Sequence, residues 1–275
     1  GTGVLNATGT VYDTRFLALI DAVSRQAERY LNRVIYPHTD TLFFDGPGGT
    51  TIFVPDLLSV TSVVEDDNLD GTFDSTWSAT DYLLYPRNAA PTSSWGRPYT
   101  QLVVNPSSDG TQDEWTKGRN NFRIIGTWGY WNVTSTSTLT SSGSLGGSGT
   151  TTMTLSGTAA ASDLKMGHTI RVDSEWMTIT ATSGTSLTVT RAVNGSPAGT
   201  HAAASTILII QYPAPLVDAV IIQAGRIWQR RNSGFATQIG IPETGQVTVF
   251  QGGLDSDVRD LLSSYRRFPL GGLGI

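Results

Sequence analysis

Residues 122–133, FRIIGTWGYWNV, place the strongest constraint on the fold, because this apolar, strand-like run has no continuation next to it. The residues that follow are dominated by Ser, Thr, Gly and Ala, and an amphipathic helical pattern returns only at Pro213. Neighbouring elements of one domain are usually joined by short connections. We therefore interpret the strand and the later helix as one domain with residues 134–210 inserted between them. We interpret Gly126 and Gly129 as breaks that turn the chain toward this junction.

The inserted tract is predicted to be a small β-module. Its first part, residues 134–152, has the Ser, Thr and Gly content of a linker. However, the tract also contains four alternating runs separated by turn-forming residues, with the sequences TMTL, TIRVD, WMTITAT and SLTVTR. Alternation with a period of two is typical of strands that bury one face. A last strand at residues 206–210 would return the chain to the point where it left.

Three amphipathic patterns predict helices in the rest of the chain, at residues 14–36, 215–231 and 254–267. In each of them apolar residues recur at steps of three and four, as in a helix that buries one face. Between the first helix and the aromatic strand, short alternating runs separated by Asp-Gly-Pro-Gly-Gly and Pro-Asp predict antiparallel hairpins.

These elements predict an α+β fold, a small helical bundle with a β-hairpin region, interrupted by an inserted all-β module. The length of 275 residues allows two modest cores. The expected domains are a discontinuous connector domain and the inserted β-domain, residues 1–133 plus 211–275 and residues 134–210.

Composition excludes several classes of function. The chain has no cysteine, so disulfides, thiolate metal sites and cysteine nucleophiles are excluded. Its net charge of -5 argues against wrapping nucleic acid, because phosphate binding requires clustered Lys and Arg. No apolar run approaches the roughly 18 residues of a membrane-spanning helix, so we expect no membrane partner.

Several segments occur in a recognisable order: AERYLNRVIYP, FFDGPGG, PDLLSVTSVV, DDNLDGTFD, DYLLYPRNA, GTWGY, IWQRRNSGF and LDSDVRDLLSSYRRF. In this order and spacing they resemble the head-tail connector (adaptor) proteins of tailed bacteriophages. In that family the helix follows the GTWGY strand within a few residues, whereas residues 134–210 intervene here. Part of the insert, VDSEWMTITATSGTSLTVTRAVNGSPAGTH, is similar to small β-modules of other phage structural proteins.

The resemblance implies a structural virion protein and not an enzyme. Such a protein forms a ring, typically a dodecamer, beneath the portal protein and above a stopper or tail-completion protein. DNA passes through the channel of the ring without sequence-specific binding. The implied location is the virion neck, at the head-tail interface, after assembly in the host cytoplasm. We expect the inserted β-domain on the outside of the ring, because an insertion in the channel would obstruct DNA.

Candidate residues for the contact with the portal or a neighbouring subunit lie at two helix ends and in the tail: Arg230, Arg231, Tyr265, Arg266, Arg267, Phe268, Leu270, Leu273 and Ile275. The arginines, with Arg226, either compensate helix dipoles or contact an acidic neighbouring ring. An apolar terminal segment such as FPLGGLGI usually requires a partner surface.

The acidic loop DDNLDGTFD offers a possible metal site. Its oxygen-bearing residues, Asp66, Asn68, Asp70 and Asp74, have the spacing of the first nine positions of a calcium loop, with Gly71 at the sharp turn. The twelfth position, which requires a bidentate Glu, is Trp77. The sequence leaves two interpretations open, a calcium loop or a solvated turn without cofactor.

Other candidate chemistry is weaker. The histidines at positions 38, 168 and 201 lack the short spacing of a zinc site, and we expect them on the surface or in loops. Asp173 and Glu175 alternate on a predicted strand and would share one face, where a carboxylate pair could act as in glycosidases or serve only solubility. The Trp content and the Ser/Thr-rich strands support an alternative function as a β-rich surface or carbohydrate-binding module.

Overall fold

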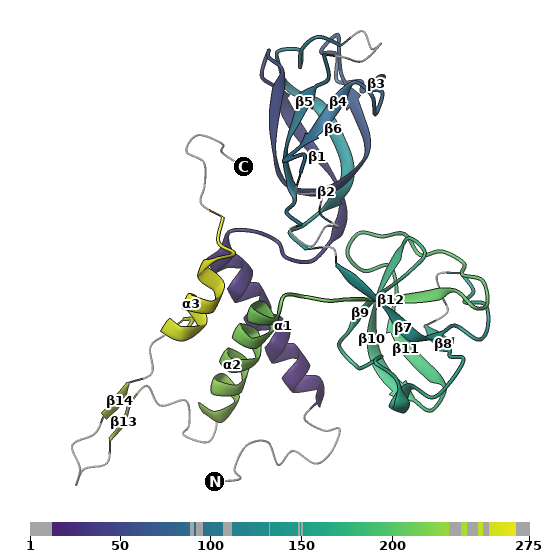
Figure 1. The fold of residues 1–275 in the computed structure, drawn as a ribbon, viewed down its shortest axis with the longest axis vertical. Helices are drawn as coiled ribbons and strands as arrows, with labels where there is room; N and C mark the ends of the chain where they lie inside the picture. Colours follow the sequence, from purple (N-terminus) through teal and green to yellow (C-terminus); the bar gives the residue numbers. More distant parts are fainter. Residues whose placement is uncertain are drawn as a thin grey trace. The chain divides into compact units, whose positions relative to one another are not determined.

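The computed structural model describes residues 13–88, 91, 96–106, 112–131, 133–147, 149, 151–230, 238–240, 247–249 and 253–267. The protein is mostly β, with 40% strand and 21% helix, and within these residues three α-helices accompany two large antiparallel sheets (Figure 1). The expected fold class, a small helical bundle with a hairpin region and an inserted β-module, is therefore wrong. The strands between the first helix and the insert, which we expected to form a hairpin region, build a six-stranded sheet of their own.

The chain divides into two compact units. One unit combines Gly1–Arg33 with Tyr212–Ile275 and contains the helices, and the other is Val34–Gln211 and contains both large sheets. The first sheet therefore belongs to the same compact unit as the second sheet, and not to the unit that contains the helices. The assignment of residues 134–210 as a domain of their own stays a prediction.

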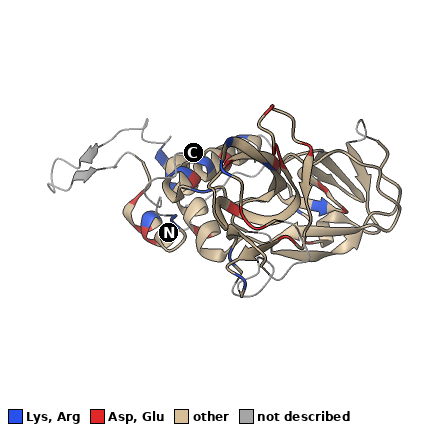
Figure 2. Ribbon diagram, turned by 90° about the horizontal axis from the view of Figure 1, so that it is seen from above, with Lys and Arg blue, Asp and Glu red and all other residues tan. Residues whose placement is uncertain are grey.

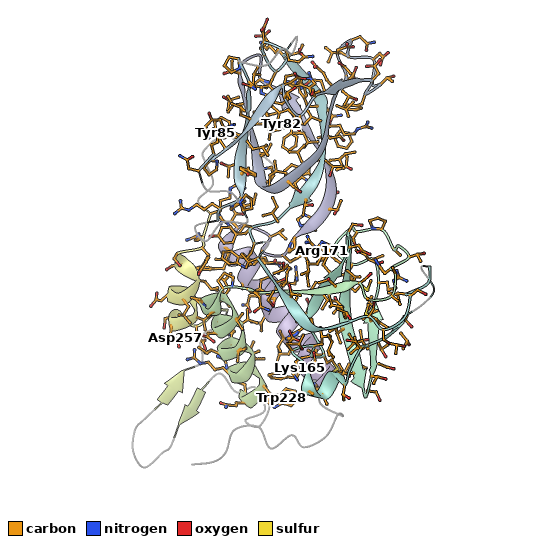
Figure 3. All side chains as sticks on the ribbon, turned by 45° about the vertical axis from the view of Figure 1, so that its right-hand side comes forward. Tyr82, Tyr85, Lys165, Arg171, Trp228 and Asp257 are labelled. Carbon is orange, nitrogen blue, oxygen red and sulfur yellow. The ribbon has the colours of Figure 1, made fainter. Side chains whose placement is uncertain are left out.

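The helical unit consists of α1 (Asp13–Leu31), α2 (Ala214–Arg230) and α3 (Ser256–Ser263), together with a hairpin of β13 (Gln238–Gly240) and β14 (Val247–Val249). Both ends of the chain contribute to its core, which contains Val23, Ala27, Leu31, Leu216, Ala219, Ala224, Trp228, Leu254, Val258 and Leu262. Figure 3 labels Trp228 on α2. Among the described residues, no helix has the length and apolarity needed to cross a bilayer.

Helix α1 ends five residues earlier than the apolar pattern predicts. Asn32 adopts a left-handed conformation with φ 54°, and the Arg33 amide donates a hydrogen bond of 3.4 Å to the Glu28 carbonyl. This is the Schellman arrangement, in which a residue with positive φ closes the last helical turn. The helical prediction for residues 32–36 is therefore wrong.

The first sheet is built from β1 (His38–Gly46), β2 (Thr51–Glu65), β3 (Ser75–Trp77), β4 (Tyr82–Tyr85), β5 (Tyr99–Val104) and β6 (Gly118–Trp128). Its order is β1-β6-β2-β5-β4, with β3 paired to β2. Figure 3 labels Tyr82 and Tyr85, which begin and end β4. Three buried aromatics organise its core: Trp77 stacks on Trp115 at 4.1 Å between ring centroids, and Phe122 meets both rings edge-on.

Strand β6 is the GTWGY strand, and it corrects our interpretation of Gly126. The strand runs through Gly126 without a break and pairs with both β1 and β2. A Cβ atom at this position would lie 2.4 Å from the Ser59 carbonyl oxygen, so glycine serves close strand approach here. Gly129, with φ 130°, follows the end of the strand.

The second sheet lies wholly within residues 134–210. Its strands are β7 (Thr134–Thr140), β8 (Thr152–Thr154), β9 (Thr169–Val172), β10 (Glu175–Ser183), β11 (Ser186–Thr190) and β12 (Thr206–Ile210), in the order β7-β12-β9-β10-β11-β8. An antiparallel bridge between Ser141 and Leu155 brings the two ends of this order together. The Gln211 amide donates to the Val133 carbonyl at 2.9 Å, so the chain leaves and returns at one point.

Candidate functional site

The second sheet contains an ionic network of Asp173, Glu175, Arg191 and His201. We call it the buried ionic network because the last three side chains are at most 3% exposed, whereas Asp173, at its edge, is 60% exposed. Glu175 opens β10 directly after the turn that follows β9, and Arg191 follows the end of β11. Antiparallel pairing places Thr178 opposite Thr190, which brings the start of β10 near the end of β11. His201 lies on the segment that returns to β12, where it bridges to Leu145. Folding thus brings together residues that are distant in sequence.

Arg191 and Glu175 form a bidentate ion pair. The Nη2 atom of Arg191 lies 2.6 Å from Oε2 of Glu175, and its Nε atom donates to Oε1 at 3.0 Å. Their side chains are only 3% and 1% exposed. Charge-assisted pairs of this geometry are among the stronger protein hydrogen bonds, and burial of such a pair requires that both charges be matched.

His201 joins the network through both ring nitrogens. Its Nε2 atom lies 2.8 Å from Oε2 of Glu175, and its Nδ1 atom lies 2.6 Å from Oδ2 of Asp173. The His201 side chain is 3% exposed, so a surface position is wrong for this histidine, although it does lie in a loop, on the segment between β11 and β12. Asp173 lies in the β9–β10 turn with φ 52° and not on a strand, yet it still contacts the same histidine as Glu175.

Backbone groups complete the network. The amides of Ala192 and Gly199 donate to Glu175 at 3.0 and 2.9 Å, and Arg191 donates to the carbonyls of Gly146, Gly147 and Gly199. Burial by itself raises the pKa of Glu175, but the bonds from Arg191, the two amides and His201 outweigh it and lower the pKa to about 2. The carboxylate is therefore ionised and saturated with donors. Such a carboxylate holds in place the loops whose amides donate to it, and it is poorly suited to act as a nucleophile or base.

The acidic loop between β2 and β3 is closed by its own hydrogen bonds. Asp66 is buried and accepts bonds from the amides of Asp70 at 3.1 Å and Gly71 at 2.9 Å. Asn68 also accepts from the Asp70 amide, while Asp70 accepts from the Thr72 amide at 2.8 Å. Hydrogen bonds from Thr72 lower the pKa of Asp70.

The fourth candidate ligand of this loop, Asp74, is exposed. In the part of the chain that the structure describes, no group of three or more His, Asp or Glu side chains is placed to hold a metal ion. The hydrogen bonds within the loop are those of a solvated turn. We carry the solvated turn forward as the prediction for this loop, and the calcium loop stays the alternative.

The arginines expected at the interface have contacts inside the helical unit. Arg226 pairs with Asp255 at 2.9 Å and with Asp257, and Arg230 lies 3.5 Å from Asp255. These hydrogen bonds raise the pKa of Arg226 and lower that of Asp257, labelled in Figure 3, to about 2. Basic and acidic segments accordingly lie side by side on the helices (Figure 2).

The segment after α3 is anchored to α1. The Arg266 guanidinium lies 5.2 Å from the centre of the Tyr30 ring, and the Arg267 amide donates to the Leu31 carbonyl at 2.8 Å. The Tyr265 amide donates to Leu262 at 3.0 Å. The other residues proposed for the interface lie outside the described residues: Arg231, Phe268, Leu270, Leu273 and Ile275.

The tryptophans that suggested a carbohydrate-binding module are mostly inside the protein. An aromatic sugar platform requires an open ring face, because the sugar packs on that face. Five tryptophans are buried, with at most 9% exposure: Trp77, Trp115, Trp128, Trp176 and Trp228. Trp131 is half-buried and donates through its indole nitrogen to the Gln211 carbonyl, and Trp95 lies outside the described residues.

Sequence reasoning singled out Asp173 and Glu175 but missed their partners. Arg191 and His201 lie 16 and 26 residues from Glu175, at separations that match no local motif. The turn between β10 and β11 is the signal that could have found Arg191. Pairing these two strands as a hairpin places the end of β11, and so Arg191, beside the start of β10. Neither a protein-family model nor a curated protein matches this sequence.

Proposed function

We propose that this chain is a structural virion protein, a head-tail adaptor that forms a ring beneath the portal and joins the capsid to the tail. The observation that supports this most is that both ends of the chain together form the helical unit. The segments that resemble connector proteins at the start and end of the chain come together in it as α1, α2 and α3, although the whole of Val34–Gln211 separates them. In sequence, the β-rich unit is thus a single insertion between α1 and α2.

The surface of α2 supports assembly into a ring. Val217 and Ile221 lie one helical turn apart and are 38% and 52% exposed, on a helix that already buries Leu216, Ala219 and Trp228 elsewhere. A helix that is apolar on more than one side normally packs against more than one neighbour. We assign the Val217 and Ile221 surface to a neighbouring copy in the ring, whose symmetry we propose to be dodecameric.

The proposed partners follow from the same role. The portal protein would lie above the ring and a stopper or tail-completion protein below it, in the virion neck, with DNA passing through without sequence-specific contacts. The residues proposed for portal or subunit contact stay those at the helix ends and in the tail. No catalytic step is proposed, because Glu175, the most deeply buried carboxylate of the network, is saturated by donors.

Light scattering coupled to size-exclusion chromatography tests the proposal, with and without a portal protein. We expect a ring, alone or on addition of portal, and we expect Ile221→Asp to abolish it. Leu69→Asp is the matched control, because Leu69 is a similarly exposed apolar residue, at 58%, in the acidic loop of the other unit. A protein that remains monomeric, does not bind the portal protein and binds glycans would instead support the alternative of a surface module.

A further inference from the structure

We propose that the Asn194–Gly195 turn locks the second sheet onto strand β1 of the first sheet, so that the two sheets move as one body. The contact is a backbone hydrogen bond of 2.8 Å from the Thr39 amide to the Asn194 carbonyl. Strand β1 is at the end of its sheet and pairs with β6. An end strand offers its outer backbone groups to another segment, and the turn uses one of them. This proposal does not depend on the adaptor function.

The fit at Gly195 shows how closely the turn approaches the strand. Asn194 and Gly195 have φ values of 56° and 72°, the left-handed pair typical of a two-residue turn. A Cβ atom on Gly195 would lie 2.0 Å from the Thr39 carbonyl oxygen and 3.1 Å from its carbonyl carbon. Both atoms belong to backbone, so neither can rotate away. Only glycine permits this contact.

The buried ionic network holds the turn in place from both sides. Before the turn, the Ala192 amide is bound to Glu175 at 3.0 Å and the Val193 amide donates to the Trp176 carbonyl at 3.1 Å. After it, the Ser196 hydroxyl accepts from the Trp176 amide at 2.9 Å, and the Gly199 amide donates to Glu175. Glu175 and Arg191 are thus positioning residues for the turn.

A second attachment point decides whether the sheets can pivot. The chain enters and leaves the second sheet side by side, where Gln211 donates to Val133 and the Trp131 indole donates to Gln211. Only the segment between β6 and β7 leads back to the first sheet, because the chain continues from Gln211 into α2. Thr39 pairs with Thr127 near the end of β6 from which that segment starts. A single connection permits rotation about itself, and the Thr39–Asn194 contact restricts this rotation because it holds a second segment, the turn after β11, against the first sheet.

Spin-label distance measurements on the full chain test the lock. The protein has no cysteine, so Thr61→Cys on β2 and Thr182→Cys on β10, both exposed positions, accept labels selectively. We expect a narrow distance distribution in the parent and a distribution broadened by about twofold or more in Gly195→Ala, where local opening frees the joint. Hydrogen exchange at the Thr39 amide should accelerate by about tenfold or more in the same variant.

Gly184→Ala is the matched control. Gly184 also has positive φ, 53°, but a Cβ there meets nothing within 4 Å, so it adds the same backbone strain without touching Thr39. Thr39→Pro is the second variant, because it removes the donor without altering the second sheet. The core amides of Ile170 and Met177 must stay protected in every variant, which shows that the second sheet is folded. A narrow distribution in both Gly195→Ala and Thr39→Pro, or equal broadening in Gly184→Ala, would overturn the lock.

Discussion

Removal of the Arg191 guanidinium should be the most damaging single change in the second sheet. Arg191→Met keeps the apolar stem but removes the ion-pair partner of Glu175, which is only 1% exposed and then keeps only its bonds with His201 and the amides of Ala192 and Gly199. Breaking a buried pair in this way typically costs about 3–5 kcal/mol. The lowering of the Glu175 pKa from 4.5 to about 2 corresponds to about 3 kcal/mol in total, to which Arg191, His201 and the amides of Gly199 and Ala192 all contribute. Because the variant keeps the last three, we expect a loss near the lower end of the range for a broken pair, about 3 kcal/mol.

Denaturant-dependent hydrogen exchange of the full chain measures this loss directly, through the amides of Ile170 and Met177 in the β9–β10 pair. Arg171→Met is the control, because Arg171 (Figure 3) lies on the same sheet and stacks 5.3 Å from the Trp176 ring. We expect this control to lose about 1 kcal/mol. Adding Glu175→Gln to Arg191→Met should restore part of the stability, because the orphaned charge is then gone. A cost below about 1 kcal/mol for Arg191→Met, or equal costs for both arginines, would refute the reasoning.

Three further predictions concern other positions. The pKa of Glu175 is lowered in the folded state, so this carboxylate adds to the free energy of unfolding above pH 4.5. That contribution is lost as the pH falls toward about 2, and Glu175→Gln should flatten this part of the plot of stability against pH. Gly126→Val should cost about 3 kcal/mol or more in a denaturant titration, since its Cβ would lie 2.4 Å from Ser59 backbone, whereas Gly143→Ala, in open space, should cost under about 1 kcal/mol. Calcium at about 1 mM should leave the amide resonances of residues 66–74 unchanged, and a saturable shift there would instead establish the calcium loop.

Local patterns predicted the elements of this protein better than their assembly. The helices near both ends of the chain can be predicted because a helical pattern depends only on residues three and four positions apart. The first helix is predicted too long because apolar residues continue past Asn32, where the helix ends. The sequence Pro55-Asp56 predicts a break between two strands. In the structure β2 continues through it, because the register with β5 shifts between Phe53 and Leu57 and accommodates the proline. The mostly β character depends on this kind of long-range pairing.

The candidate site shows the same difference between local patterns, which the sequence predicts, and long-range partners, which it does not. Its place in an alternating run makes Glu175 a candidate, but its chemistry depends on Arg191 and His201, which only the folded hairpins bring close. The carboxylate pair that alternation predicted on one strand face is instead a turn residue and a strand residue joined by His201. Spacing rules describe neighbours along a strand and cannot specify such partners.

The central claim is that this chain forms an adaptor ring, and an electron-microscopy image of the purified chain mixed with a portal protein tests it most directly. We expect a closed ring, coaxial with the portal, that disappears with Ile221→Asp and persists with Leu69→Asp. Single copies that remain unattached at saturating portal concentration would contradict it.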